Sequence, residues 1–339
     1  MKKILGLISL VILSLSCSST DDNQNNINST DYSESILITN EGNFMSANAS
    51  ISAINPDLKT IDNSIYKKAN NSSVGDVAQS ITFYNDLTFI VVNNSNTIEV
   101  VNTNDFKKVY TIAENLAAPR YAVVVNNLLY VTNANNNTVT IYNVLNFEYV
   151  KSINLSFMPE LIIENNDKVY VSSNFYDSNS TIAIIDTTTN DIDALLHLNL
   201  PINGLTQAGN NVYVLATSSN ETNIYTIQNK SILNTSTYPV IDAKFLTVDK
   251  GNLYFTANLG IYSIHENKLS TANELPTELF KVEDNSWSSL YGFEVFNGQI
   301  FTSDANGFTE ASKITVYDTN GIKLAQFAAG IGANGFYKK

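Results

Sequence analysis

The sequence has 339 residues, a formal net charge of −13 at pH 7, and a single arginine among its 19 basic residues. An acidic surface of this kind repels nucleic acid and anionic lipid, so neither is expected as a partner. One cysteine and two histidines exclude an intrachain disulfide and a zinc site of the usual Cys and His type.

Residues 1–16 predict a signal peptide. Two lysines, Lys2 and Lys3, precede an apolar run that is too short to span a membrane. The residues before Cys17 resemble a bacterial lipobox, although Ser14 stands where an aliphatic residue is usual. The resemblance implies cleavage before Cys17 and attachment of lipid to its sulfur. In the alternative interpretation, Cys17 merely lies next to an ordinary cleavage site.

Residues 17–34 predict a flexible tether, because a polar segment without a hydrophobic pattern cannot bury enough apolar surface to fold. Serines and acidic residues directly after Cys17 resemble the signal that Bacteroidetes use to move lipoproteins to the cell surface. That resemblance implies a protein in the outer membrane, anchored by lipid alone and facing the cell exterior.

Residues 35–339 repeat one short pattern seven times. An apolar strand runs into a polar turn residue in SISAIN, TIEVVN, TVTIYN, TIAIID, NIYTIQ, GIYSIH and KITVYD. The mean spacing of about 44 residues is typical of a propeller blade. Further β-branched and aromatic strands flank each repeat, and no convincing amphipathic helix is present. The pattern predicts an all-β fold, a seven-bladed β-propeller of four-stranded antiparallel blades.

The two ends of this region predict how the ring closes. The first repeat begins at SILITN without an inner strand of its own, and the chain ends on GIGANGFYKK, which parallels the lead-in of LAAPRYAVV. We therefore expect the C-terminal strand to pair into the first blade, which leaves no open edge between the first and last blades.

Residues 130–133 read YVTN, the letters that name one class of propeller repeat. Together with NEGNFMSANASISAINPD, VGDVAQSITFYND and APRY, they resemble a Bacteroidetes group of YVTN-type propeller lipoproteins, the BtuG cobalamin-binding group. The resemblance implies capture of cobalamin or another corrinoid at the cell surface and its transfer to a TonB-dependent outer-membrane transporter. Other chelates, such as haem or siderophores, stay open.

One rim of the central funnel should carry the ligand site, since the loops there vary while the blades stay rigid. Arg120 lies at this rim and could clamp a carboxylate or phosphate, or pair with a neighbour such as Asp76. Rim aromatics that could stack on a ligand or simply pack between blades are Phe44, Tyr121, Phe175, Tyr176, Trp287, Tyr291 and Phe308. Polar side chains that could bond the ligand or close turns are Asn43, Asp76, Gln79, Asn133, Asn174 and Asp304.

Two other functions compete with ligand capture. An adhesive module that binds glycan or protein could use the same rim. A propeller lyase or hydrolase is the weaker alternative, because neither His197 nor His265 is expected at the rim and the only thiol belongs to the anchor. We therefore expect no enzymatic activity, no cofactor and no bound metal.

Overall fold

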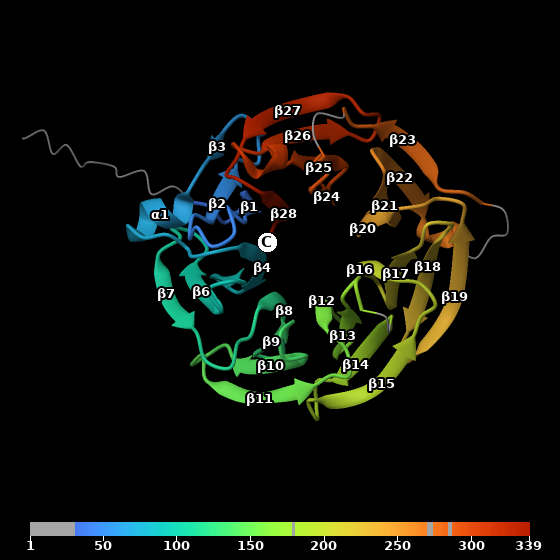
Figure 1. The fold of residues 1–339 in the computed structure, drawn as a ribbon, viewed down its shortest axis with the longest axis horizontal. Helices are drawn as coiled ribbons and strands as arrows, with labels where there is room; N and C mark the ends of the chain where they lie inside the picture. The colour runs from blue at the N-terminus through green and yellow to red at the C-terminus, as the bar shows by residue number, and fades with distance from the viewer. Residues whose placement is uncertain (1–30, 178–179, 270–273, 284–286) are drawn as a thin grey trace, which may run out of the picture. The chain divides into compact units, whose positions relative to one another are not determined.

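Seven four-stranded antiparallel sheets form a ring in which each sheet is one blade (Figure 1). This confirms the prediction of an all-β, seven-bladed β-propeller. The structure is a computed structural model that describes residues 31–177, 180–269, 274–283 and 287–339. The expected signal peptide, the lipidation site Cys17 and most of the expected tether lie outside the described residues.

Each blade begins with an inner strand and continues outward. From the first blade to the seventh, the inner strands are β28 (Ala333–Tyr337), β4 (Ala78–Tyr84), β8 (Pro119–Val125), β12 (Pro159–Asn165), β16 (Ile202–Ala208), β20 (Ala243–Asp249) and β24 (Gly292–Phe296). The second strands are β1 (Ile36–Asn40), β5 (Leu87–Val92), β9 (Leu128–Asn133), β13 (Lys168–Ser173), β17 (Asn211–Thr217), β21 (Asn252–Ala257) and β25 (Gln299–Asp304).

The two remaining strands complete each blade. The third strands are β2 (Ser50–Ile54), β6 (Thr97–Asn102), β10 (Thr138–Asn143), β14 (Thr181–Asp186), β18 (Thr222–Gln228), β22 (Gly260–His265) and β26 (Lys313–Asp318). The outer strands are β3 (Ile61–Asp62), β7 (Lys108–Ile112), β11 (Tyr149–Asn154), β15 (Asp191–His197), β19 (Ser231–Tyr238), β23 (Thr277–Lys281) and β27 (Lys323–Ala328). The short 3₁₀ turns are η1 (Glu266–Lys268) and η2 (Asn306–Phe308).

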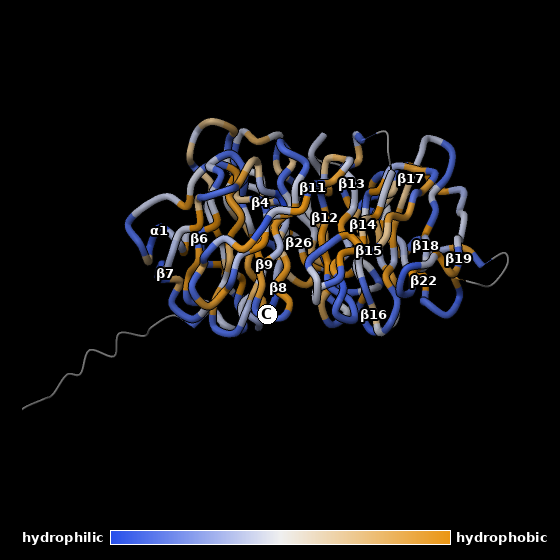
Figure 2. Tube along the Cα trace, turned by 90° about the horizontal axis from the view of Figure 1, so that it is seen from below, coloured by the Kyte–Doolittle hydropathy of each residue, from blue (hydrophilic) through white to orange (hydrophobic). Residues whose placement is uncertain are grey.

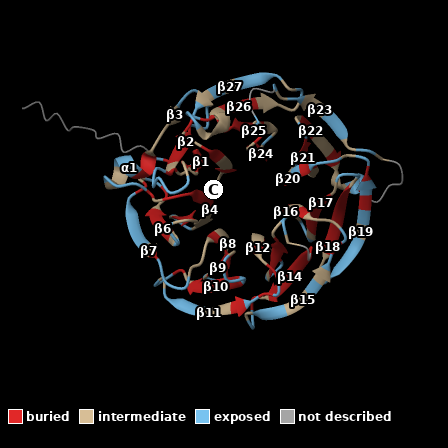
Figure 3. Cartoon of the chain, in the orientation of Figure 1, coloured by how far each residue is buried: buried red, intermediate tan, exposed pale blue. Residues whose placement is uncertain are grey.

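The core lies between neighbouring blades. The second and third strands are buried on both faces, as in β5 and β10, whereas the outer strands are largely exposed (Figure 3). Apolar residues follow the strands and hydrophilic loops lie at their ends (Figure 2). Sheets packed face to face on both sides need almost continuous β-branched and aromatic side chains. That requirement explains the repeated apolar runs in the sequence.

The C-terminal strand closes the ring, as the sequence predicts. In the first blade β28 pairs antiparallel with β1, with Ile38 opposite Phe336 and Leu37 opposite Tyr337. Phe336 is buried beside Phe301 of the seventh blade, with ring centroids 5.7 Å apart. The last strand of the chain therefore joins the first blade to the seventh.

The first blade departs from the expected pattern in two ways. Its outer strand β3 has only two residues and is followed by a short helix, α1 (Ile65–Asn70), which the sequence did not indicate. Tyr32, placed in the tether by sequence, is 7% exposed and packs edge-on against Phe106 at 5.7 Å. Its backbone N–H also donates to Asn104 O at 3.0 Å. The folded unit therefore begins at residue 31 rather than 35, because an aromatic ring in this segment finds a buried site.

Among the described helices, none is long and apolar enough to cross a membrane.

Candidate functional site

Irregular starts of the inner strands supply the polar side chains of the site. Strand pairing shifts register in the first residues of β4, β8, β12 and β28. These shifts include Gln79, Arg120, Glu160 and Asn334. A β-bulge inserts an unpaired residue and redirects its side chain, which is why bulges are common next to functional sites. Here the bulges bring four polar side chains from four blades together.

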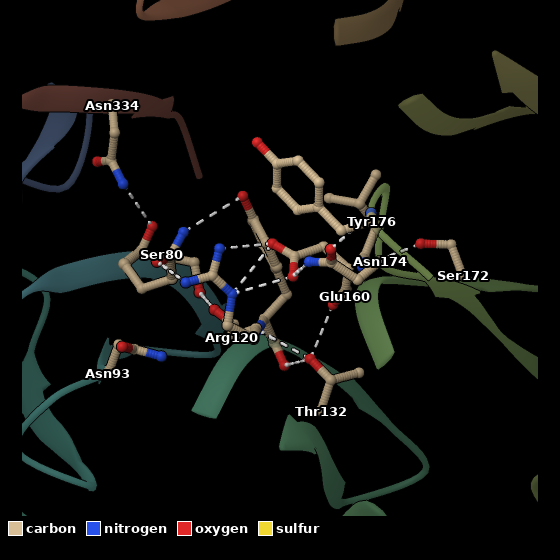
Figure 4. A network of polar contacts seen from close by, with 12 residues as sticks. Ser80, Asn93, Arg120, Thr132, Glu160, Ser172, Asn174, Tyr176 and Asn334 are labelled. Atoms are coloured by element: carbon tan, nitrogen blue, oxygen red, sulfur yellow. Dashed lines mark hydrogen bonds and ion pairs between the residues drawn. The ribbon is translucent and has the colours of Figure 1, made fainter. Parts of the chain in front are cut away.

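Arg120 is the centre of this network (Figure 4). Its Nε donates to both carboxylate oxygens of Glu160 at 3.0 Å, and its Nη2 donates to Oε1 at 2.6 Å. Its Nη1 donates to Gln79 Oε1 at 2.5 Å. Burial alone would lower the pKa of Arg120, but the charge of Glu160 raises it above its ordinary value. The arginine is therefore permanently charged and largely committed to the protein, with two N–H groups left over.

The partner of Arg120 differs from the one suggested by sequence. Asp76 accepts a hydrogen bond from Asn94 Nδ2 at 2.6 Å, and Glu160 pairs with the arginine instead. Asn174, another candidate from the sequence, donates its Nδ2 to Glu160 Oε2 at 2.7 Å and so helps to hold this carboxylate in place. The arrangement favours the structural interpretation of Arg120, which the sequence left open.

A second carboxylate, Glu41, extends the network toward the first and seventh blades. Tyr291 donates its hydroxyl to Glu41 Oε2 at 3.0 Å, and Asn334 Nδ2 donates to Oε1 at 2.9 Å. Burial raises the pKa of Glu41, and these hydrogen bonds and the charge of Arg120 oppose the rise. Burial also raises the pKa of Tyr291, so that its hydroxyl stays a donor at neutral pH.

Four residues of the network, Glu41, Gln79, Arg120 and Tyr291, border a pocket of about 450 Å³ at the rim of the first, second, third and seventh blades. Six sequence candidates line it: Asn43, Phe44, Gln79, Arg120, Tyr291 and Phe308. Asn43 Nδ2 donates to Phe308 O at 2.8 Å and so connects loops of the first and seventh blades. The pocket volume lies within the range usual for ligand sites.

Aromatic rings form a shelf beside the pocket. Phe308 meets Tyr291 edge-on at 5.0 Å, and it stacks with Trp287 at 6.0 Å and an interplanar angle of 24°. Trp287 is 79% exposed and Phe44 is 64% exposed. Large apolar rings left open to solvent beside a pocket are typical of a binding surface.

The remaining candidates lie elsewhere. Phe175 and Tyr176 follow Asn174 on the rim and meet edge-on at 5.3 Å, with Tyr176 86% exposed. Asn133 is buried inside the third blade, where its amide bonds Ala117 N and Thr140 Oγ1. Tyr121 is turned toward a different cavity of the channel.

Asp304 stabilises the two loops that carry Trp287 and Phe308 of the shelf. Its carboxylate accepts hydrogen bonds from Ser288, Ser289 and the Asn306 backbone N–H. Neither histidine lies at the pocket, since His197 is on outer strand β15 and His265 ends β22. In the described part of the chain no three His, Cys, Asp or Glu side chains gather in a way that could hold a metal ion.

The sequence did not indicate Glu41, Glu160 or Asn334 as ligand-site residues. A signal for Glu160 was present, because Pro119 and Pro159 begin equivalent inner strands and each precedes a charged residue of opposite sign. Glu41 and Asn334 lie 293 positions apart and offered no comparable signal.

Comparison with protein families shows to which family the chain belongs. Residues 34–208, more than half of the chain, match the family described as a domain of unknown function, DUF5074. The chain belongs to the DUF5074 family. A search of curated proteins finds no match to this DUF5074 chain.

Solved structures share the fold of this DUF5074 chain. A quinonprotein alcohol dehydrogenase-like protein from Bacteroides thetaiotaomicron is 15% identical with a TM-score of 0.67, over 88% of this chain and 76% of that one. The computationally designed Ika8 protein is 13% identical with a TM-score of 0.61, over 91% and 92% of the two chains. At such low identity the similarity concerns the propeller fold alone.

Proposed function

We propose that this protein is a cell-surface lipoprotein that captures a large planar solute, cobalamin or another corrinoid, and hands it to a TonB-dependent outer-membrane transporter. The observation that carries the proposal is the rim pocket with its aromatic shelf, in which the exposed Trp287 stands beside the half-buried Phe308 and Tyr291. Open aromatic faces offer stacking area to a broad ligand, and the neighbouring amides offer hydrogen bonds to its polar arms.

The volume of the pocket limits how much of such a ligand can enter it. A corrinoid is larger than a pocket of about 450 Å³. One edge would enter beside Asn43 and Gln79, and the rest of the ring would lie on the shelf. The ligand would be held through its periphery, because neither His197 nor His265 is near the pocket. This mode of binding needs no catalytic group, in keeping with a capture protein rather than an enzyme.

The chain outside the site supports the same proposal. The apolar N-terminal segment and Cys17 fit an exported lipoprotein, and the YVTN letters at residues 130–133 lie in β9. These motifs resemble those of the BtuG group, and this resemblance is the reason for proposing a corrinoid as the ligand and a TonB-dependent transporter as the partner.

A glycan-binding function is the second candidate, and one surface favours it. This surface, the flank, is the outer side of the second and third blades around Tyr110 and Phe147. Tyr110 and Phe147 stack at 4.9 Å, and they line a groove of about 550 Å³ together with Tyr149, Glu114 and Glu148. Aromatic faces beside carboxylates suit sugar rings and their hydroxyl groups. This groove lies on the second and third blades, away from the rim pocket.

Isothermal titration of cyanocobalamin into a protein of residues 31–339 tests the proposal. We expect binding of one ligand per chain, and Trp287→Ala should weaken it roughly tenfold or more, as for central aromatic anchors. Tyr149→Ala is the matched control, since it removes an exposed ring from the flank. A flat titration would refute corrinoid capture. Equal loss in both variants would refute the rim as the site.

A further inference from the structure

A second cavity lies among the inner strands and shares no lining residue with the rim pocket. It has a volume of about 230 Å³ and is bordered by β8, β12, β16, β20, β24 and β28. Its aromatic wall consists of Tyr121, Phe245, Phe293, Phe336 and Tyr337. The volume is below the usual range for ligand sites, so only a small molecule fits.

Among the described residues that line this cavity, Glu294 is the one carboxylate. Its Oε1 accepts hydrogen bonds from the Thr247 hydroxyl and from the Val295 N–H, the latter at 2.9 Å. No basic side chain lines the cavity, and no ion pair joins Glu294 to a basic residue in the described ranges. Burial raises the pKa of Glu294 to about 7, and the two hydrogen bonds oppose this rise only in part.

A carboxylate without a counterion contrasts with Glu160, which faces Arg120. An ionised acid in apolar surroundings is costly unless a positive charge accompanies it. Arg120 supplies that charge for Glu160, and no residue of the described ranges supplies it for Glu294. The cavity therefore offers a negative group to an incoming cation.

The backbone of β20 is distorted at the wall of this cavity. Phe245 has a φ of +56°, in the left-handed region that bulky residues rarely adopt. It lies where the pairing of β20 shifts register between Lys244 and Thr247. Its ring packs against Phe293 with centroids 6.2 Å apart. The strained bulge thus holds an aromatic ring at the same cavity that contains Glu294.

We propose that this inner cavity binds a small organic ammonium cation, with Glu294 as its counter-charge and the surrounding aromatic rings as its cage. The faces of aromatic rings attract cations within about 6 Å of the ring centroid, and quaternary ammonium groups are commonly recognised in this way. Tyr121 and Tyr337 complete the set of ionisable groups at the cavity. Burial raises the pKa of Tyr121 to about 12 and raises that of Tyr337 as well, so both stay neutral and Glu294 is the one charged group among the described lining residues.

Titration calorimetry of the full-length protein with choline, and with its neutral isostere 3,3-dimethylbutan-1-ol, tests the proposal. We expect one choline per chain, no binding of the isostere, and tighter choline binding at pH 8 than at pH 6 as Glu294 ionises. Glu294→Gln should weaken binding at least tenfold. Phe245→Leu should weaken it by about three- to thirtyfold, the range of a desolvated cation–π contact.

Two controls separate this cavity from other acidic or aromatic surfaces. Glu148→Gln removes an exposed carboxylate of the flank and should leave choline affinity unchanged. Trp287→Ala alters the rim shelf and should also leave it unchanged. The proposal is overturned if choline gives no heat at pH 8, if the isostere binds equally well, or if Trp287→Ala abolishes binding while Glu294→Gln does not.

Discussion

At the scale of single residues, the environment of a charge decides its role. Glu160 and Glu294 have the same side chain and both come from inner strands. Glu160 accepts a fork of hydrogen bonds from Arg120 and another from Asn174, whereas Glu294 has two neutral donors. A planar guanidinium matches the two carboxylate oxygens in a way that an ammonium cannot. This match gives a physical reason for an arginine at position 120 in a chain whose other basic residues are lysines.

Arg120→Lys should therefore lower the stability of the protein. Lysine keeps the charge but loses the bidentate contact and the bond to Gln79, so we expect a loss of about 1–3 kcal/mol in the free energy of unfolding. Urea denaturation measures it. Lys151→Met is the matched control: it removes the exposed Lys151–Asp191 pair and should cost less than about 1 kcal/mol. Equal stability of Arg120→Lys and wild type would contradict the structural role.

At the scale of strands, the start of each inner strand builds the site and the end of the chain closes the ring. The bulges in β4, β8, β12 and β28 direct polar side chains into one network. β28 contributes Asn334 to that network and also pairs with β1. One short strand therefore serves both closure and the site, and removing it should affect both.

Deletion of residues 331–339 should abolish cooperative folding, since β1 would lose its pairing with β28 and Phe301 its contact with Phe336. Deletion of only Lys338 and Lys339, which follow β28, is the control and should shift the melting temperature little. Circular dichroism melts compare the two. An unchanged melting temperature in the longer deletion would show that β28 does not hold the ring together.

At the scale of the whole molecule, closure of the ring brings the ends of the chain to the same pocket. Glu41 and Asn43 follow the first strand, while Tyr291 and Phe308 come from the seventh blade. Blades packed face to face keep these loops in fixed positions, and the loops remain free to vary. A rigid ring with a pocket on one rim is compatible with the capture function that we propose.

Cys17→Ser should release the protein from the membrane if the chain is the lipoprotein that we propose. A serine has no sulfur to accept the lipid, so the variant should incorporate no labelled palmitate and should leave the membrane fraction. The melting temperature of the released protein should equal that of the wild type, because Cys17 precedes the folded unit of residues 31–339. Membrane retention of the variant would contradict anchorage through this residue.

The repeat period and the short apolar runs were enough to predict the blade number, the strands and the closure by the last strand. These are local properties, and each blade must bury the same faces. The short helix α1 and the burial of Tyr32 were not predictable in this way. Both depend on how the incomplete outer edge of the first blade is covered, which is a question of tertiary packing.

The sequence by itself determined the seven-bladed architecture and predicted a set of candidate residues at one rim. Only the tertiary structure decided which of them meet, because the first, second, third and seventh blades become neighbours when the ring closes. It also decided that Arg120 faces Glu160 and that, among the residues which the structure describes, Glu294 faces no basic side chain. The interaction of a charge depends on the distance and burial of its partners, which the order of residues along the chain does not specify.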